Sequence, residues 1–247
     1  MFGNAENATI KNLTIKGGVF GNTAAGGFIG QAEGTIDVID CRNEAEIGSI
    51  NFAGGCIGMV ANNSVITITN FVNMRDINDS IAAGGVIGQS ENNPEFNLNK
   101  IYIDSNDITG THASGLIGRL YGNNDNGSIN ISEIGINANL LGSVESGGFY
   151  LLGTTALPML RRIKDSYFNG TGINLEDGLS GLVTQITGVF NSITKKYYAG
   201  VNDEKWVTGV NGGTAGLKCF LAIGSLAPVN DVESYLASKG FTQNPPV

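Results

Sequence analysis

Short runs in the N-terminal and central parts of the chain alternate apolar and polar positions with a period of two. The clearest runs cover residues 9–15, 65–69, 100–104 and 128–132. This alternation is typical of strands that bury one face. A turn-rich pair follows each strand-like stretch, for example Gly21-Asn22 and Gly48-Ser49. The pattern therefore predicts many short strands separated by tight turns.

A second pattern repeats between these strands and has the form small-Gly-apolar-apolar-Gly. Its clearest copies are residues 25–30, 53–58, 83–88 and 113–118. The glycine directly before the apolar pair recurs at a nearly constant interval, which lengthens slightly along the chain. The last residue of each of the four clear copies is also glycine. These repeat glycines are Gly27, Gly55, Gly85, Gly115, Gly148 and Gly181, with Gly30, Gly58, Gly88 and Gly118 closing the motif.

A repeat of about 30 residues with two or three short strands predicts a parallel β-solenoid, in which each repeat forms one coil. We expect an all-β fold of about six or seven coils over residues 1–188. Equivalent side chains should then stack. We expect an inner column of Phe28, Cys56, Val86, Leu116 and Phe149, with Ile29, Ile57, Ile87 and Ile117 on the opposite face of their strands.

The C-terminal part departs from the repeat. Residues 189–247 are predicted to be a mixed cap, with a helix near 230–239 that begins at Asn230 and stops at Gly240. A small independent binding domain is the alternative interpretation. At the other end, the first coil is expected to start around Ala8 and to leave an uncovered strand edge. That edge favours self-association or another protein partner.

Asparagines recur at a corner of the predicted coil. Asn43, Asn73, Asp104 and Asn169 each lie four residues before an isoleucine, and stacked amides can form a hydrogen-bonded ladder along a solenoid. Solvated loop asparagines are the alternative.

The glycine motif resembles the GLUG repeat, whose core is Gly-Leu-hydrophobic-Gly. The four copies here end in residues 27–30, 55–58, 85–88 and 115–118, and only the last retains leucine, at Leu116. Such repeats occur in large surface or secreted proteins of bacteria and some protists. The resemblance covers residues 8 to about 185 and implies a β-helical stalk or binding surface. It brings no catalytic residue, because the motif is structural.

Composition and charge narrow the range of functions. The chain has 37 glycines in 247 residues, 15% charged residues and a net charge of −8. This composition disfavours a helical bundle, and the charge disfavours nucleic acid as a partner. No apolar run reaches the length of a membrane span. The three cysteines Cys41, Cys56 and Cys219 form no C-x-x-C pair and are expected to be buried apolar residues.

The cellular location is expected to be extracellular or the cell surface. The N-terminus has no basic and apolar leader pattern, so a fragment or an intracellular protein is the alternative. Seven N-x-S/T sequons favour secretion weakly and make glycans expected attachments or ligands. They lie at Asn7, Asn12, Asn62, Asn78, Asn126, Asn130 and Asn169.

Catalytic patterns are weak. His112 is the sole histidine, and we expect no cofactor or metal. Asp76, Asp79, Asp104 and Asp107 could meet on adjacent coils, as could other corner aspartates (Asp37, Asp40 and Asp165). The sequence therefore predicts a non-enzymatic adhesin-like rod. The alternatives are a scaffold or filament subunit that assembles end to end, and a polysaccharide lyase or glycoside hydrolase that uses Asp or Glu.

Overall fold

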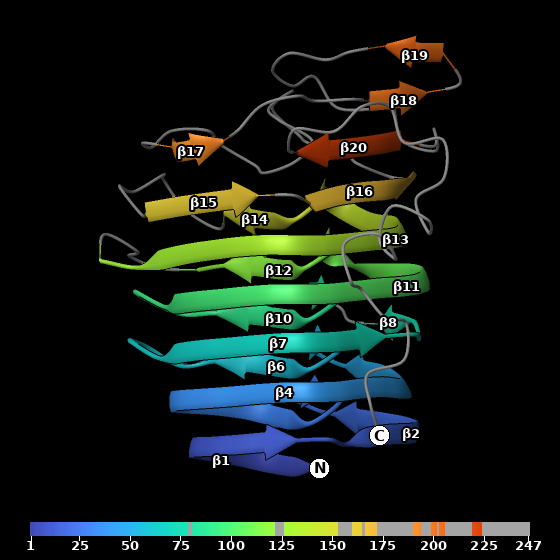
Figure 1. The fold of residues 1–247 in the computed structure, drawn as a ribbon. Helices are drawn as coiled ribbons and strands as arrows, with labels where there is room; N and C mark the ends of the chain where they lie inside the picture. The colour runs from blue at the N-terminus through green and yellow to red at the C-terminus, as the bar shows by residue number, and fades with distance from the viewer. Residues whose placement is uncertain are drawn as a thin grey trace.

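The computed structural model describes residues 1–78, 81–121 and 126–152, together with isolated strands further along the chain. These residues form the predicted all-β fold, a parallel β-solenoid of about five turns (Figure 1). Six or seven coils were expected. The later repeats fall beyond residue 152, where only single strands are described.

Each coil contributes strands to the same stacked sheets. The front of the solenoid holds β1 (Phe2–Lys11), β4 (Ile29–Ser49), β7 (Val65–Asn73), β11 (Glu95–Ser114), β13 (Ser128–Gly147), β15 (Leu160–Lys164) and β17 (Phe190–Ile193). The side holds β2 (Thr14–Gly21), β8 (Ile77–Asn78) and β16 (Ser166–Thr171), together with the later parts of β4, β7, β11 and β13. The shorter strands are β3 (Ala24–Gly26), β5 (Phe52–Gly54), β6 (Ile57–Val60), β9 (Ala82–Gly84), β10 (Ile87–Ser90), β12 (Ile117–Leu120) and β14 (Tyr150–Leu152).

The parallel register repeats with the spacing that the glycines predict. In the front sheet, one buried column contains Ile10, Val38, Ile68, Leu98 and Ile131, each paired with the next coil. The repeat glycines also stack, since the amide of Gly27 donates to Gly54 at 3.3 Å and that of Gly55 to Gly84 at 3.2 Å. The predicted solenoid register is therefore confirmed.

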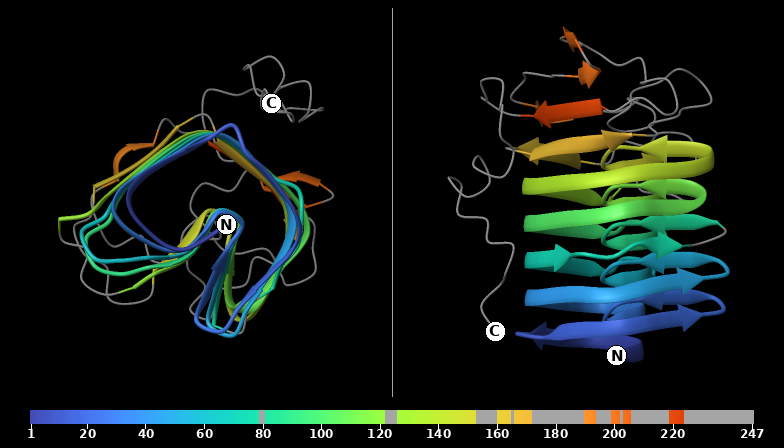
Figure 2. Two further views of the ribbon diagram at one scale, coloured as in Figure 1. Left: turned by 90° about the horizontal axis from the view of Figure 1, so that it is seen from below. Right: turned by 90° about the vertical axis from the view of Figure 1, so that its right-hand side faces the viewer.

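Both apolar positions of the glycine motif are buried. Val86 and Ile87 are each 0% exposed, and the equivalent residues of the other coils are also in the core. The prediction treated Phe28 and its equivalents as the inner column, with Ile29 and its equivalents facing away from it. Each coil instead folds inward at the motif, so both faces of this segment are covered (Figure 2). Phe28 packs edge to face on Phe71 of the side sheet, with ring centroids 6.2 Å apart.

The closing glycines allow the two limbs of this inward fold to touch through their backbones. A Cβ on Gly58 would lie 2.6 Å from the Ala25 nitrogen of the preceding coil. A Cβ on Gly88 would lie 2.7 Å from the Ala53 nitrogen and 2.5 Å from the Gly58 oxygen. Glycine is therefore required for close approach at both positions.

The cysteine prediction is confirmed where side chains are described. Cys41 and Cys56 are free thiols in the core. Burial raises the pKa of both thiols, well above the ordinary value for Cys56, and disfavours the reactive thiolate. The side chain of Cys219 lies outside the described residues.

The two ends of the solenoid differ. At the C-terminal end, β17 continues the parallel ladder on β15, beyond the predicted boundary at residue 188, whereas β20 (Cys219–Ile223) runs antiparallel on β16. The strands β18 (Ala199–Val201) and β19 (Asp203–Lys205) pair antiparallel with each other. The predicted helix at 230–239 lies outside the described residues. At the N-terminal end, β1 begins at Phe2 and not around Ala8, and within the described part β1 and β2 pair only with β4.

Candidate ligand-binding surfaces

The predicted asparagine ladder is present over two coils. Asn43 and Asn73 are fully buried, and the Asn43 amide donates to the Asn73 side-chain oxygen at 2.6 Å. The Asn43 amide also donates to the Ala45 carbonyl, and Asn73 donates to Ser105 Oγ at 2.9 Å. These bonds satisfy polar groups inside the core, so this ladder stabilises the corner and is not available to a ligand.

Asp104 and Asn169 do not belong to the column of Asn43 and Asn73, which corrects the prediction. The residue that stacks on Asn73 is Ile103, and Ile136 follows in the next coil. Asp104 instead pairs in register with Asn137, which pairs with Asn169. The reason is that β11 has one extra residue between this column and the isoleucine that follows it. Counting back four residues from each isoleucine therefore selects residues from two neighbouring columns.

A second corner column was missed in the sequence. Five residues there have positive φ angles of 53–57°, the left-handed conformation that asparagine tolerates best among residues with a side chain. Asn70 donates to the Asp40 carboxylate at 2.7 Å across one coil step. The column contains Asn12, Asp40, Asn70, Lys100 and Glu133, whose spacing matches that of the repeat glycines step by step. That shared spacing was the available signal.

The sequons divide into exposed and constrained sites. Asn7, Asn12, Asn62, Asn78 and Asn126 are exposed, whereas Asn130 is half-buried and donates to Asn97 at 3.0 Å. Several exposed sites also bond between coils: Asn7 accepts from the Thr35 amide, and Asn62 accepts from Asn92 at 2.9 Å. The side chain of Asn169 lies outside the described residues. Glycosylation stays a prediction for the exposed set.

The carboxylates near the predicted acidic cluster carry structural bonds. Asp76 accepts from the amides of Asn106 and Asp107 at 2.9 and 3.1 Å, and Asp107 accepts from Asn139 at 3.3 Å. Asp79 lies outside the described residues. His112 places Nδ1 3.3 Å from a carboxylate oxygen of Glu145 in the next coil. Each of these groups joins two coils.

The described residues contain neither a metal-binding cluster nor a membrane-spanning helix. Within that part of the chain, no three His, Cys, Asp or Glu side chains gather as they would around a metal ion. The same part contains no helix with the length and apolar character of a membrane span.

The repeat glycines are internal and serve the fold. Gly27, Gly55, Gly85, Gly115 and Gly148 stack one on the next. A Cβ on Gly115, for example, would lie 2.3 Å from the carbonyl oxygen of Gly148. Gly181 lies outside the described residues. The described members of this set line no surface that a ligand could reach, with the closing glycines Gly30, Gly58, Gly88 and Gly118 also buried.

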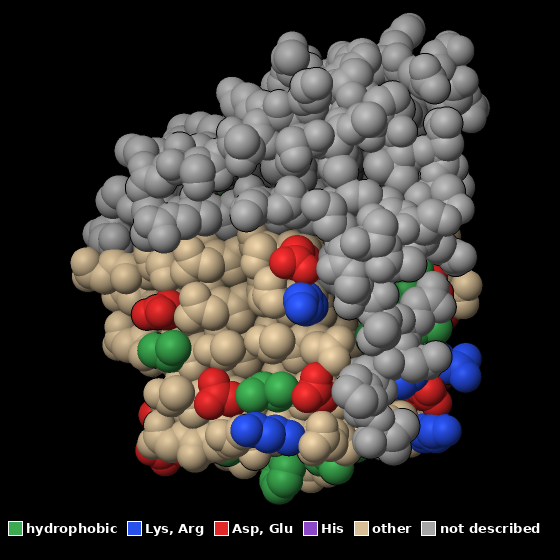
Figure 3. Space-filling view, viewed as in Figure 1, with side chains coloured by type: hydrophobic (Ala, Val, Ile, Leu, Met, Phe, Trp, Pro, Cys, Tyr) green, Lys and Arg blue, Asp and Glu red, His purple; other side chains and the backbone are tan. Residues whose placement is uncertain are grey.

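The front sheet presents a regular outer face. Its outward positions align in two columns, in which seven of ten side chains are Thr, Asn or Ser. Figure 3 shows this face as largely uncharged polar surface with scattered charges. We call these residues the front columns: Thr9, Asp37, Thr67, Asn97 and Asn130 in the first, and Lys11, Ile39, Thr69, Asn99 and Ser132 in the second.

Neighbouring members of the front columns hydrogen-bond along the solenoid axis. Asn99 donates to Ser132 Oγ at 2.7 Å, and Asn130 donates to Asn97 at 3.0 Å. These bonds hold the side chains in order, while amide and hydroxyl groups retain further donor and acceptor capacity. Over the coils of β7, β11 and β13, the face can therefore offer amide or hydroxyl groups at each coil step of about 4.8 Å.

An ion pair connects the first two coils on the side sheet. Glu44 contacts Arg42 Nε at 2.5 Å and Lys16 Nζ at 3.2 Å. Hydrogen bonds from Arg42 and Lys16 hold the pKa of the Glu44 carboxyl below its ordinary value. Glu44 is partly exposed, so the pair contributes little to stability.

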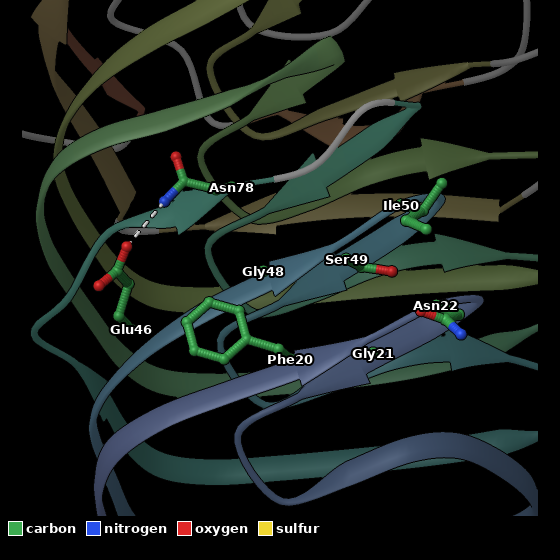
Figure 4. Close-up of a pocket in the computed structure, with 8 residues that line it drawn as sticks. All are labelled: Phe20, Gly21, Asn22, Glu46, Gly48, Ser49, Ile50 and Asn78. Carbon is green, nitrogen blue, oxygen red and sulfur yellow. Dashed lines mark hydrogen bonds between the residues drawn. The ribbon is translucent and has the colours of Figure 1, made fainter.

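An open pocket of about 730 Å³ lies on the side sheet over the first coils. Two of its residues, Phe20 and Ile50, are large, apolar and exposed, at 71% and 59%. Glu46 accepts a hydrogen bond from the Asn78 amide at 3.3 Å (Figure 4). We call this site the Phe20 pocket; it is lined by Phe20, Gly21, Asn22, Glu46, Gly48, Ser49, Ile50 and Asn78.

Comparison with known proteins does not assign the chain to a group. No family model matches it, and neither a curated protein nor a solved structure matches it.

Proposed function

We propose that this chain is a non-enzymatic adhesive β-solenoid that binds a surface polymer along its front columns. The observation that carries the proposal is the alignment of short Thr, Asn and Ser side chains in both front columns over three consecutive coils, from Thr67 and Thr69 to Asn130 and Ser132. A polymer with regularly spaced hydroxyl groups, such as a polysaccharide, can meet amide or hydroxyl groups at each of these three coils. Many weak contacts then act together.

The proposed location is extracellular or at the cell surface. The resemblance to GLUG repeats supports this location, as do the sequons that lie at exposed positions. The side-chain hydrogen bonds between coils support a rigid rod, because they fix the register of each coil on the next.

The front columns can be tested by cosedimentation with insoluble polysaccharides, using cellulose, chitin and β-1,3-glucan as probes. We expect the protein to sediment with at least one of them. Asn97→Lys should reduce the bound fraction at least fivefold, because a long charged side chain would stand above the flat face. Asn106→Lys is the matched control, since Asn106 is exposed away from the front columns. Equal binding by both variants would contradict the assignment of this face.

Self-association is a second proposal, carried by the free edges of β1 and β2. In the described part these strands pair only with β4, and Leu13 beside them is exposed. Unpaired strand edges promote pairing with another chain. At the other end of the solenoid, β20 pairs antiparallel with β16, which disfavours the addition of a further copy of the chain there. A closed dimer through two N-terminal edges is therefore favoured over an open filament.

Sedimentation velocity over a range of concentrations tests this second proposal. We expect a monomer–dimer equilibrium, which Leu13→Pro should weaken by removing a backbone donor and altering the edge. Leu13→Ala keeps the donor and should leave more of the dimer. A monomer at every concentration would rule out the edge as an interface.

A further inference from the structure

We propose that the Phe20 pocket binds a single pyranose ring of a neutral sugar. This inference goes beyond the front columns and does not depend on them. The pocket lies on the side sheet, and the left-handed corner residue Asp40 separates that part of β4 from the front sheet. The two surfaces can therefore be tested separately.

The first argument is the position of the Phe20 ring. Phe20 stacks in register on Gly48, and Gly48 on Asn78. A Cβ on Gly48 would lie 2.9 Å from Cδ1 of the ring, and one on Gly18 would lie 2.7 Å from Cε2. The ring thus lies over two glycines, which leave room for it, and its side chain remains 71% exposed.

The second argument is the polar edge of the pocket. Glu46 and Asn78 come from adjacent coils and are held together by their 3.3 Å hydrogen bond (Figure 4). Ser49 Oγ accepts from the amides of Asn51 and Phe52, at 3.2 and 3.3 Å, so its own hydroxyl hydrogen points elsewhere. Asn22 adds a second amide to the lining.

These groups fit the chemistry of a sugar better than that of an anion. The C–H face of a pyranose carries slight positive charge and packs on the negative face of an aromatic ring. Sugar hydroxyls can donate to the Glu46 carboxylate, and bonds to a charged acceptor are the stronger ones. Asn22, Asn78 and Ser49 can donate in return. The Glu46 carboxylate and the net charge of −8 both disfavour phosphate or acidic sugars.

The size and openness of the site set the expected strength. A shallow pocket with one aromatic platform orders few groups and encloses little of the ligand, so a dissociation constant of about 1 mM is expected for one sugar. Several such rings on one polymer would bind more tightly through avidity.

The test is a titration of the full chain with soluble methyl glycosides of glucose, galactose, mannose and N-acetylglucosamine, followed by amide chemical shifts. We expect at least one glycoside to shift residues 18–22, 46–50 and 78. Phe20→Ala should weaken that binding at least tenfold, and Glu46→Gln should weaken it several-fold. Phe20→Tyr keeps the ring and should retain binding.

Tyr121→Ala is the matched control, because it removes another exposed aromatic ring outside the pocket. It should leave the affinity unchanged, as should Asn97→Lys on the front columns. The proposal is overturned if no glycoside shifts the pocket residues, or if Phe20→Ala binds as well as the original chain. If Phe20→Ala still cosediments with the polysaccharide, the front columns are supported as the polymer-binding face. Whether the Phe20 pocket binds a sugar is decided by the glycoside titration alone.

Discussion

Replacing Gly88 with alanine is expected to destabilise the solenoid by about 3 kcal/mol or more. The added Cβ would lie 2.5 Å from the Gly58 oxygen and 2.7 Å from the Ala53 nitrogen. Both are backbone atoms held in the parallel ladder, so neither can move without breaking the register of a coil. The measurement is urea unfolding followed by far-ultraviolet circular dichroism, and a variant that fails to fold would agree with the prediction.

The matched control is Gly3→Ala. Gly3 also lies in a strand, but a Cβ there would meet no atom within 4 Å. The free energy of unfolding should then change by no more than about 0.5 kcal/mol. Equal stability of Gly88→Ala and Gly3→Ala would show that the limbs of the inward fold are not in backbone contact.

Replacing Phe71 with alanine is expected to cost about 3–5 kcal/mol, because it removes a large core side chain and leaves a cavity. Phe71 is 0% exposed and packs edge to face on Phe28 at the tip of the inward fold. The loss should appear as a lower urea midpoint with an unchanged slope.

Phe20→Ala provides the comparison for the same chemical change at an exposed ring. Its stability should stay within about 0.5 kcal/mol of the original chain, even though we expect it to lose sugar binding. A loss at Phe20 that equals the loss at Phe71 would contradict the burial assigned to the two rings.

The repeat spacing of the glycines could be predicted from the sequence, and with it the fold class. Parallel stacking requires equivalent residues to recur once per coil, so a ruler such as Gly27, Gly55 and Gly85 reports the length of each coil directly. Period-two alternation then identifies inward residues such as Val38 and Ile68. Both features depend on local order along the chain and need no knowledge of what packs across the coil.

The candidate binding surfaces were harder to predict from the sequence. The left-handed corner at Asp40, Asn70 and Lys100 has the same spacing as the glycines, but lysine and asparagine share no side-chain chemistry that marks a common conformation. The Asn43–Asn73 ladder ends because Ile103 takes the next place, which depends on a one-residue difference in coil length. The sequence does not distinguish Phe20 from other strand residues. Its ring lies over Gly18 and over Gly48 of the next coil, and the sequence alone does not show that these two glycines meet beneath it.

The sequence by itself determined that this chain is a β-solenoid with one repeat per coil and a row of stacked glycines. Only the tertiary structure decided what lies on each side of the glycine motif. Alternation states that Phe28 and Ile29 face opposite ways, but it cannot state whether the second face meets solvent or more protein. The inward fold covers both faces, because the closing glycines let backbone meet backbone across coils. Such contacts join residues that are distant in the chain, and a one-dimensional pattern contains no record of them.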